Sequence, residues 1–116
     1  MDLELSARAG RACTVVRVGG ELDMATGPQL QDFLQGVTTS GAVRLVLDCT
    51  DLTFMDSSGL GLLMLWFKQM QDKGGRLCVA AAQQPVALVL QLSAVDQVLD
   101  VYESVDAAET GMPVAD

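Results

Sequence analysis

Hydrophobic and polar positions along the chain change their spacing several times, and each change predicts an element of secondary structure. Near the N-terminus, alternating and β-branched residues predict two short strands, over residues 3–6 and 13–18. The stretch "RAGR" between them favours a hairpin, because Gly10 is free to take a positive φ. Gly19 and Gly20 are then expected to end the second strand.

The spacing becomes that of a helix in "ATGPQLQDFLQGV", residues 25–37. Thr26 is a good N-cap, and Gln29 follows three residues later, as a capping box requires. Pro28 suits the first turn, where its missing N–H costs no hydrogen bond. One apolar stripe follows at positions i, i+3, i+4 and i+7, formed by Leu30, Phe33, Leu34 and Val37.

The rest of the chain alternates strands and helices. We expect a central strand at 43–48, a loop at 49–56, and a helix from Ser58 to about Lys73. A strand at 76–80, a helix at 85–93, an edge strand at 98–102 and a short helix at 104–109 follow. This order indicates an α/β domain with parallel strands and one antiparallel edge. The domain is expected to cover residues 1–109, with a flexible tail at 110–116.

Two loops follow strands at the end of the sheet where α/β proteins gather functional residues. The loop "GGELD" supplies Asp23, and "MDSSG" supplies Asp56, Ser57 and Ser58. We expect these four side chains to meet on one rim.

Three interpretations of "MDSSG" stay open. Asp and Ser are favoured helix caps, and Gly59 allows a tight turn or close packing. A nucleophilic serine of the G-x-S-x-G type lacks its first glycine, because Met55 occupies that position. A phosphoacceptor serine is the third interpretation, since a helix N-terminus suits a phosphate that adds nearly two negative charges.

Composition removes many enzymes from consideration. The chain has no histidine, which excludes Ser-His-Asp and Cys-His catalysis and histidine phosphotransfer. Cys13, Cys49 and Cys78 are far apart and form no C-x-x-C pair, so they are expected to be small apolar side chains. The sequence therefore predicts that the protein is not an enzyme and has no cofactor or metal.

The formal net charge is −8, from seven basic and fifteen acidic residues. Such a surface opposes nucleic acid and anionic lipid, and favours basic protein partners. No secretion signal is evident, and the longest apolar stretch, near residues 60–67, is too short to span a bilayer. The expectation is a cytoplasmic protein with no direct nucleic-acid or membrane binding.

The helix that follows Ser58 is apolar almost all round. One side is expected to face the sheet, and the other carries Leu62, Leu65, Trp66 and Gln69. Either neighbouring helices cover this second side, or it forms an exposed patch for protein docking. In the second case Trp66 is the anchor.

Several segments, in order along most of the chain, carry a resemblance to a known family. They are Gly20-Glu21-Leu22-Asp23, Pro28 with Leu30, "LVLDCTDLTFMDSSGLGLL" (45–63), "GGRL" (74–77), "LSAVDQV" (92–98) and "VYESVDAA" (101–108). Through them the sequence resembles the STAS domains, and within these the bacterial anti-sigma factor antagonists. The upstream "GELD" together with "DSSGLG" makes the resemblance specific.

The resemblance implies a single-domain fold, a mixed sheet of four to five strands with helices mainly on one side. It also implies partner switching. The unphosphorylated antagonist binds an anti-sigma factor that is also a serine kinase, and this releases a sigma factor. The kinase then phosphorylates the antagonist, and a PP2C-type phosphatase resets the cycle.

The family motif assigns roles to residues of this chain. Its phosphoacceptor corresponds to Ser57, and Ser58 supports the start of the helix. Asp23 and Asp56 match acidic positions that help to engage the kinase. The predicted partner-binding set is completed by Gly59, Leu62 and Trp66.

One residue of this chain departs from the family pattern, and one alternative function is compatible with the same fold. The family often has glycine where this chain has Ala94, and a positive φ there would cost alanine about 1 kcal/mol. The alternative function is a non-phosphorylated STAS scaffold or ligand-sensing module in a larger regulatory complex, since helix capping alone justifies a serine at this place.

Overall fold

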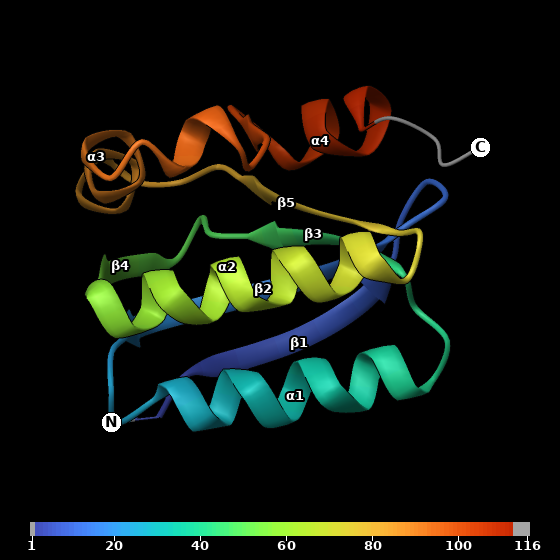
Figure 1. Cartoon of the computed structure of the whole chain (residues 1–116), viewed down its shortest axis with the longest axis horizontal. Helices are drawn as coiled ribbons and strands as arrows, with labels where there is room; N and C mark the ends of the chain where they lie inside the picture. Colours follow the sequence, from blue (N-terminus) through green and yellow to red (C-terminus); the bar gives the residue numbers. More distant parts are fainter. Residues whose placement is uncertain (1, 113–116) are drawn as a thin grey trace.

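A computed structural model describes residues 2–112 of the protein, and strands alternate with helices through most of this range (Figure 1). The elements in chain order are β1 (Glu4–Ala9), β2 (Thr14–Leu22), α1 (Gly27–Thr39), β3 (Arg44–Asp48), β4 (Leu52–Met55), α2 (Ser57–Asp72), β5 (Arg76–Ala80), α3 (Gln84–Leu92), the short 3₁₀ helix η1 (Val95–Gln97), β6 (Val101–Tyr102) and α4 (Val105–Gly111).

The strands form one mixed sheet in the order β1-β2-β3-β5-β6. β1 pairs antiparallel with β2, whereas β2 with β3, β3 with β5, and β5 with β6 are parallel. The predicted α/β class and its antiparallel edge are confirmed. The structure adds a short strand that the sequence analysis assigned to a loop, because β4 pairs with the second half of β2.

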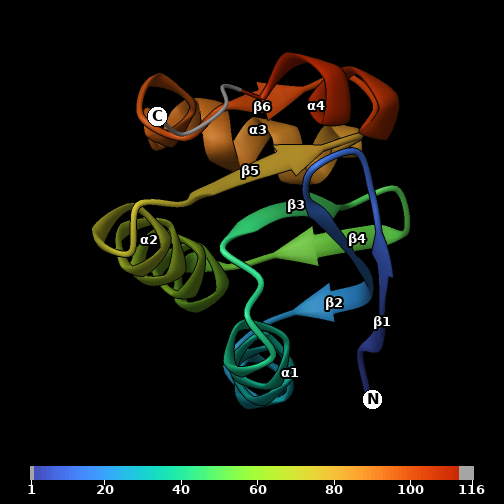
Figure 2. The same cartoon turned by 90° about the vertical axis from the view of Figure 1, so that its right-hand side faces the viewer.

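Helices cover the two faces of the sheet unequally. The larger core lies between one face and α1, α2 and α3, and it contains Leu34, Leu63 and Leu90 from these helices. The smaller core lies under α4 and contains Val46, Cys78 and Ala108. Residues along β3 and β5 alternate between the two cores, as the side-chain period of a strand requires. The expectation of helices mainly on one side is confirmed. Figures 1 and 2 show α4 near β5 and far from α1.

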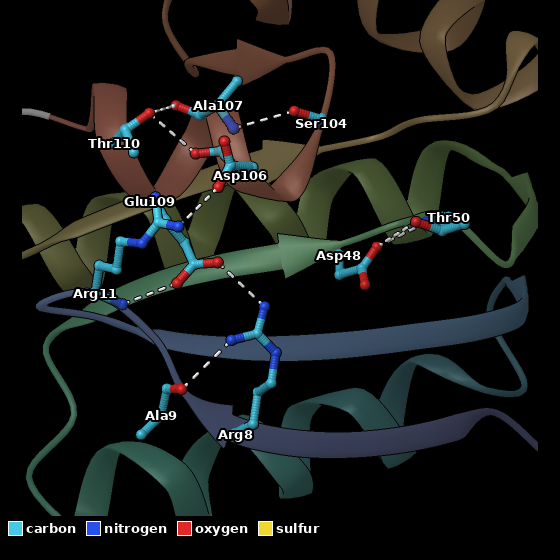
Figure 3. Close-up of polar contacts among 10 residues, drawn as sticks. All are labelled: Arg8, Ala9, Arg11, Asp48, Thr50, Ser104, Asp106, Ala107, Glu109 and Thr110. Atoms are coloured by element: carbon cyan, nitrogen blue, oxygen red, sulfur yellow. Dashed lines mark hydrogen bonds and ion pairs between the residues drawn. The ribbon is translucent and has the colours of Figure 1, made fainter.

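Ion pairs hold α4 against the β1–β2 hairpin (Figure 3). Arg8 lies 3.1 Å from the Glu109 carboxylate, and the Arg11 backbone N–H donates to the same carboxylate at 2.8 Å. The Arg11 guanidinium also lies 3.0 Å from Asp106. These contacts fix the helix over the smaller core.

The last helix runs past residue 109, the expected end of the domain. α4 continues to Gly111, and the Met112 side chain is buried in the smaller core. The apolar side chain of Met112, three residues past the expected domain end, explains the extension. The rest of the expected tail, 113–116, lies outside the described residues.

Gly19 and Gly20 do not end β2, which continues to Leu22. Instead the register with β4 shifts between Gly20 and Glu21, and Gly20 has a φ of +107°. A glycine at a shifted register adopts this backbone conformation at little cost. The predicted break is therefore a bulge within a longer strand.

Thr26 is the N-cap residue of α1, as expected, but the predicted capping box is wrong. The Thr26 hydroxyl donates to the Glu21 carbonyl at 2.7 Å instead of capping the helix. The Gln29 amide binds Asp2 and the Leu3 N–H, because β1 begins beside the first turn of α1. Pro28 does lie in the first turn, as expected.

Ala94 takes the positive φ that the sequence analysis considered, with a value of +61°. It follows Ser93, the C-cap of α3, at the position where helices favour glycine. Ala12 and Ala81 share this left-handed conformation, with φ of +57° and +58°. Three alanines therefore occupy backbone positions that strain an L-residue.

Candidate functional site

The two loops expected to form a rim lie side by side. The Asp56 N–H donates to the Leu22 carbonyl at 3.2 Å, which joins the start of α2 to the end of β2. Asp23 follows Leu22 directly, so its loop adjoins the residues that open α2. The fold thus brings together two segments more than thirty residues apart in the sequence.

Asp56 is the N-cap of α2. Its Oδ1 accepts from the Gly59 N–H at 3.0 Å and from the Ser58 hydroxyl at 2.6 Å. These bonds stabilise the carboxylate and lower the pKa of Asp56, with the Ser58 hydroxyl as the largest cause and the Gly59 N–H next. The capping interpretation of "MDSSG" is confirmed, and Asp56 supplies the cap.

Ser57 and Ser58 differ in how their hydroxyls are engaged. Both residues are exposed, and Ser57 is the first residue of α2. The Ser58 hydroxyl donates to Asp56. Within residues 2–112, no hydrogen-bond partner of the Ser57 hydroxyl is found. Ser57 therefore presents the more accessible oxygen.

Asp23 is held by its own loop. Its Oδ1 accepts from the N–H groups of Ala25 and Thr26, at 2.9 and 3.0 Å. The Asp23 N–H in turn donates to the Thr26 hydroxyl at 3.0 Å. These reciprocal bonds fix the half-buried carboxylate beside the start of α1.

A groove of about 350 Å³ lies between the first turns of α1 and α2. Its lining includes Asp23, Ser58 and Leu62 from the predicted partner-binding set. It also includes Met24 and Pro28, which add apolar surface to its lining. The structure thus places three of the six predicted residues around one hollow next to Ser57.

Two members of the predicted set lie beneath the surface. Trp66 is 1% exposed, and its indole N–H donates to Gln31 Oε1 of α1 at 2.7 Å. The interpretation of Trp66 as an exposed anchor is therefore wrong, because α1 covers Trp66, whereas Leu65 on the same side of α2 stays exposed. Gly59 is buried against Leu22, which leaves no room for a side chain. Its role is to let α2 begin close to β2.

Sequence reasoning missed two apolar residues near the rim. Met24 follows Asp23, lines the groove, and is 80% exposed. Phe54 is exposed on β4, two residues before Asp56. At Met24 the available signal was a large apolar side chain inside a polar loop, whereas Phe54 lies among the residues of β4, where no such signal marks it. Exposed residues of this kind are common in docking surfaces.

The segments that build the rim carry acids and no bases. Neither residues 18–43 nor residues 45–67 contain Lys or Arg, whereas Glu21, Asp23, Asp32 and Asp56 lie among them. The nearest basic residue before the rim in sequence, Arg17, pairs with Asp51 and Glu4. Negative charge on the rim is therefore compensated little from within these segments.

Residues 2–112 hold neither a candidate metal centre nor a candidate membrane span. No cluster of three or more Cys, Asp or Glu side chains is arranged to hold a metal ion there. In the same range, no helix is both long and apolar enough to cross a membrane.

Comparison with known proteins shows which family the chain belongs to. The STAS domain family matches residues 4–108, and an anti-sigma F factor antagonist from Paenibacillus polymyxa is 30% identical over 98% of each chain. The chain is a STAS domain protein of the anti-sigma factor antagonist family. An anti-sigma-B factor antagonist from Staphylococcus aureus is 25% identical to the present chain, over 91% of this chain and 98% of the relative.

The fold of the present chain agrees with that of a solved structure. The crystal structure of an anti-sigma factor antagonist from Mycobacterium paratuberculosis superposes with a TM-score of 0.84 and 26% identity, over 94% of this chain and 92% of the other. The family is one of non-enzymatic regulators, in agreement with the expectation from the missing histidine.

Proposed function

We propose that this antagonist binds an anti-sigma factor through the rim around Ser57, acts in the cytoplasm, and is switched off by phosphorylation of Ser57. The partner is an anti-sigma factor with serine kinase activity, and its capture releases a sigma factor. A PP2C-type phosphatase removes the phosphate. The relatives support the first step, because they are named as antagonists of anti-sigma factors.

The observation that carries the proposal is the state of the Ser57 hydroxyl. It lies at the exposed first position of α2, while the neighbouring Ser58 hydroxyl is bound to Asp56. A kinase needs an acceptor oxygen that can approach the γ-phosphate in line. Ser57 meets this requirement without any rearrangement of the helix start.

Met24, Leu62 and the neighbouring carboxylates give the docking surface its chemistry. The exposed Met24 side chain and the groove beside it offer apolar area to a partner. Asp23 and Asp56 favour a partner with basic residues at the contact. Met24 replaces Trp66 as the apolar residue expected to matter most for affinity.

Phosphorylation would act by charge. A phosphate adds nearly two negative charges to a rim that already holds Asp23 and Asp56. Like charges placed against each other at an interface cost several kcal/mol. We therefore expect phosphorylation to raise Kd about 100-fold, which corresponds to a penalty of about 2.8 kcal/mol.

The test uses the anti-sigma factor kinase encoded in the same genome, with ATP and Mg²⁺. Intact-mass measurement should show one added phosphate on the wild type and on Ser58→Ala, and none on Ser57→Ala. Titration calorimetry should show that Ser57→Ala binds the kinase with the Kd of the unphosphorylated wild type, both before and after incubation with ATP. The Kd of the phosphorylated wild type should be about 100-fold higher.

Two results would redirect the assignment. Absence of phosphate on any serine, with binding retained, would favour the STAS scaffold or ligand-sensing module. Loss of binding by a folded Ser57→Ala would contradict the switch itself, because removal of one hydroxyl from an exposed position adds no charge and no bulk.

A further inference from the structure

Exposed apolar residues gather on a second surface, formed by α3, η1 and β6. Leu88 and Leu92 lie one helical turn apart on α3, and Leu92 is 78% exposed. Val98 follows η1 and is 57% exposed, and Val101 is exposed on β6. The 14 residues from Leu88 to Val101 thus include four of the eight large hydrophobic residues that are exposed in the described chain.

A hollow of about 360 Å³ lies within this surface, which we call the α3–β6 surface. It is lined by Ala87, Leu90 and Gln91 of α3, by Asp96 of η1 and by Val101 of β6. Figure 2 shows α3 and β6 close together, with β6 at the edge of the sheet. The exposed leucines of α3 therefore adjoin a hollow that is lined by both apolar and polar residues.

All charged side chains in this part of the sequence, after Arg76, are acidic. No Lys or Arg follows Arg76 in the sequence. Asp96 lines the hollow, and neither Asp96 nor Glu103 forms an ion pair with any residue in the range 2–112. The surface therefore combines exposed apolar side chains with an acidic border, Asp96 in the hollow and Glu103 just after β6, which has no ion-pair partner among residues 2–112.

This combination selects one class of occupant. A second copy of the chain would bring the same acidic border against itself, which is repulsive. An anionic lipid surface would be repelled for the same reason. A helix with an apolar face and flanking lysines or arginines complements both the hollow and its border.

We propose that the α3–β6 surface is a second docking site, for a basic amphipathic helix of a protein partner. Its hollow shares no lining residue with the groove beside Ser57. Occupation of this surface is therefore independent of the charge on Ser57. Such a site would keep a regulatory partner attached through both states of the proposed switch.

The test uses a designed peptide of about 18 residues, with leucines on one face and lysines on the other. A matched peptide has glutamate in place of every lysine. In ¹H–¹⁵N NMR titrations we expect the basic peptide to shift the amides of 84–103 with a Kd on the order of 10–100 µM. The acidic peptide should cause no shifts there, because the acidic border repels it.

Matched variants separate this site from general attraction to an acidic protein. Leu92→Gln should weaken binding of the basic peptide about tenfold, whereas Leu65→Gln, a similarly exposed leucine on α2, should leave Kd unchanged. Ser57→Asp should also leave Kd unchanged. The inference is overturned if the shifts centre on the Ser57 rim, if both leucine variants weaken binding equally, or if neither peptide binds. None of these results bears on phosphorylation of Ser57.

Discussion

The two glycines near the start of α2 offer a direct test of how the site is built. Gly59 and Gly61 lie two residues apart in the same helix, and both change to alanine in the experiment. A Cβ on Gly59 would lie 2.8 Å from Leu22 Cγ, 3.0 Å from the Leu22 carbonyl oxygen and 3.0 Å from Met55 Cγ. A Cβ on Gly61 meets no atom within 4 Å.

These distances predict opposite effects on the free energy of unfolding. Alanine in a helix interior is favoured over glycine by about 0.8–1.0 kcal/mol, so Gly61→Ala should stabilise the protein by about that amount. The same gain at Gly59 is opposed by overpacking, which costs about 1–3 kcal/mol. The Leu22 carbonyl belongs to β2 and cannot move aside freely. Gly59→Ala should therefore fall about 1–3 kcal/mol below Gly61→Ala in stability.

Urea denaturation followed by Trp66 fluorescence measures both values. Trp66 is the only tryptophan and is buried, so its emission changes on unfolding. The difference between the variants cancels most of the helix-propensity term. If the two variants are equally stable within about 0.3 kcal/mol, close packing of α2 on β2 does not determine where Ser57 lies, and the reasoning fails.

Three further predictions follow from the described contacts. Ala94→Gly should raise stability by about 0.5–1 kcal/mol in thermal melts, because relief of a φ of +61° outweighs the added freedom of the unfolded chain, whereas Ala87→Gly within α3 should lower it. The Arg11 N–H and then Arg8 lower the pKa of Glu109 below its ordinary value. The stabilisation from its carboxylate is therefore fully present above the ordinary glutamate pKa and is lost as pH falls through the lowered pKa of the folded protein. Melts at pH 3, 5 and 7 should show a smaller loss of stability on acidification for Glu109→Gln than for wild type. Burial raises the pKa of Cys49 and of Cys78 to about 12, so a disulfide-exchange reagent at pH 8 should modify at most Cys13 in the native protein, and faster reaction of a second thiol would contradict the described packing.

Local patterns were sufficient for most of the fold. The apolar stripe of α1 buries Leu30 and Leu34 as its spacing predicts, and α2 begins within one residue of the expected position. Alternation of strands and helices predicted parallel pairing. In each case the signal lies within one turn or a few residues of the element that it predicts.

Elements that depend on distant partners were not predictable in the same way. "LTFM" forms β4 only because β2 continues past Gly20 and offers a free edge. Trp66 is covered because α1 places Gln31 within hydrogen-bond distance of the indole, whereas Leu65 on the same side of α2 stays exposed. An all-round apolar helix carries no periodicity that reveals which neighbour covers it.

The site itself was predicted in its residues more than in its contacts. Asp23, Asp56 and the two serines do lie on adjoining loops, as strand order implied. The exposure of Met24 depends on the path of the loop before α1, which no local pattern specifies.

The hydrogen bonds of the rim also limit what a phosphate on Ser57 would do to this chain. The Gly59 N–H and the Ser58 hydroxyl are already bound by Asp56, and the N–H groups of Ala25 and Thr26 are bound by Asp23. The rim segments contain no Lys or Arg to attract the new charge. A phosphate would therefore compete poorly for internal donors and would face outward. Its charge would act on an approaching partner, while the helix start that presents it stays as it is.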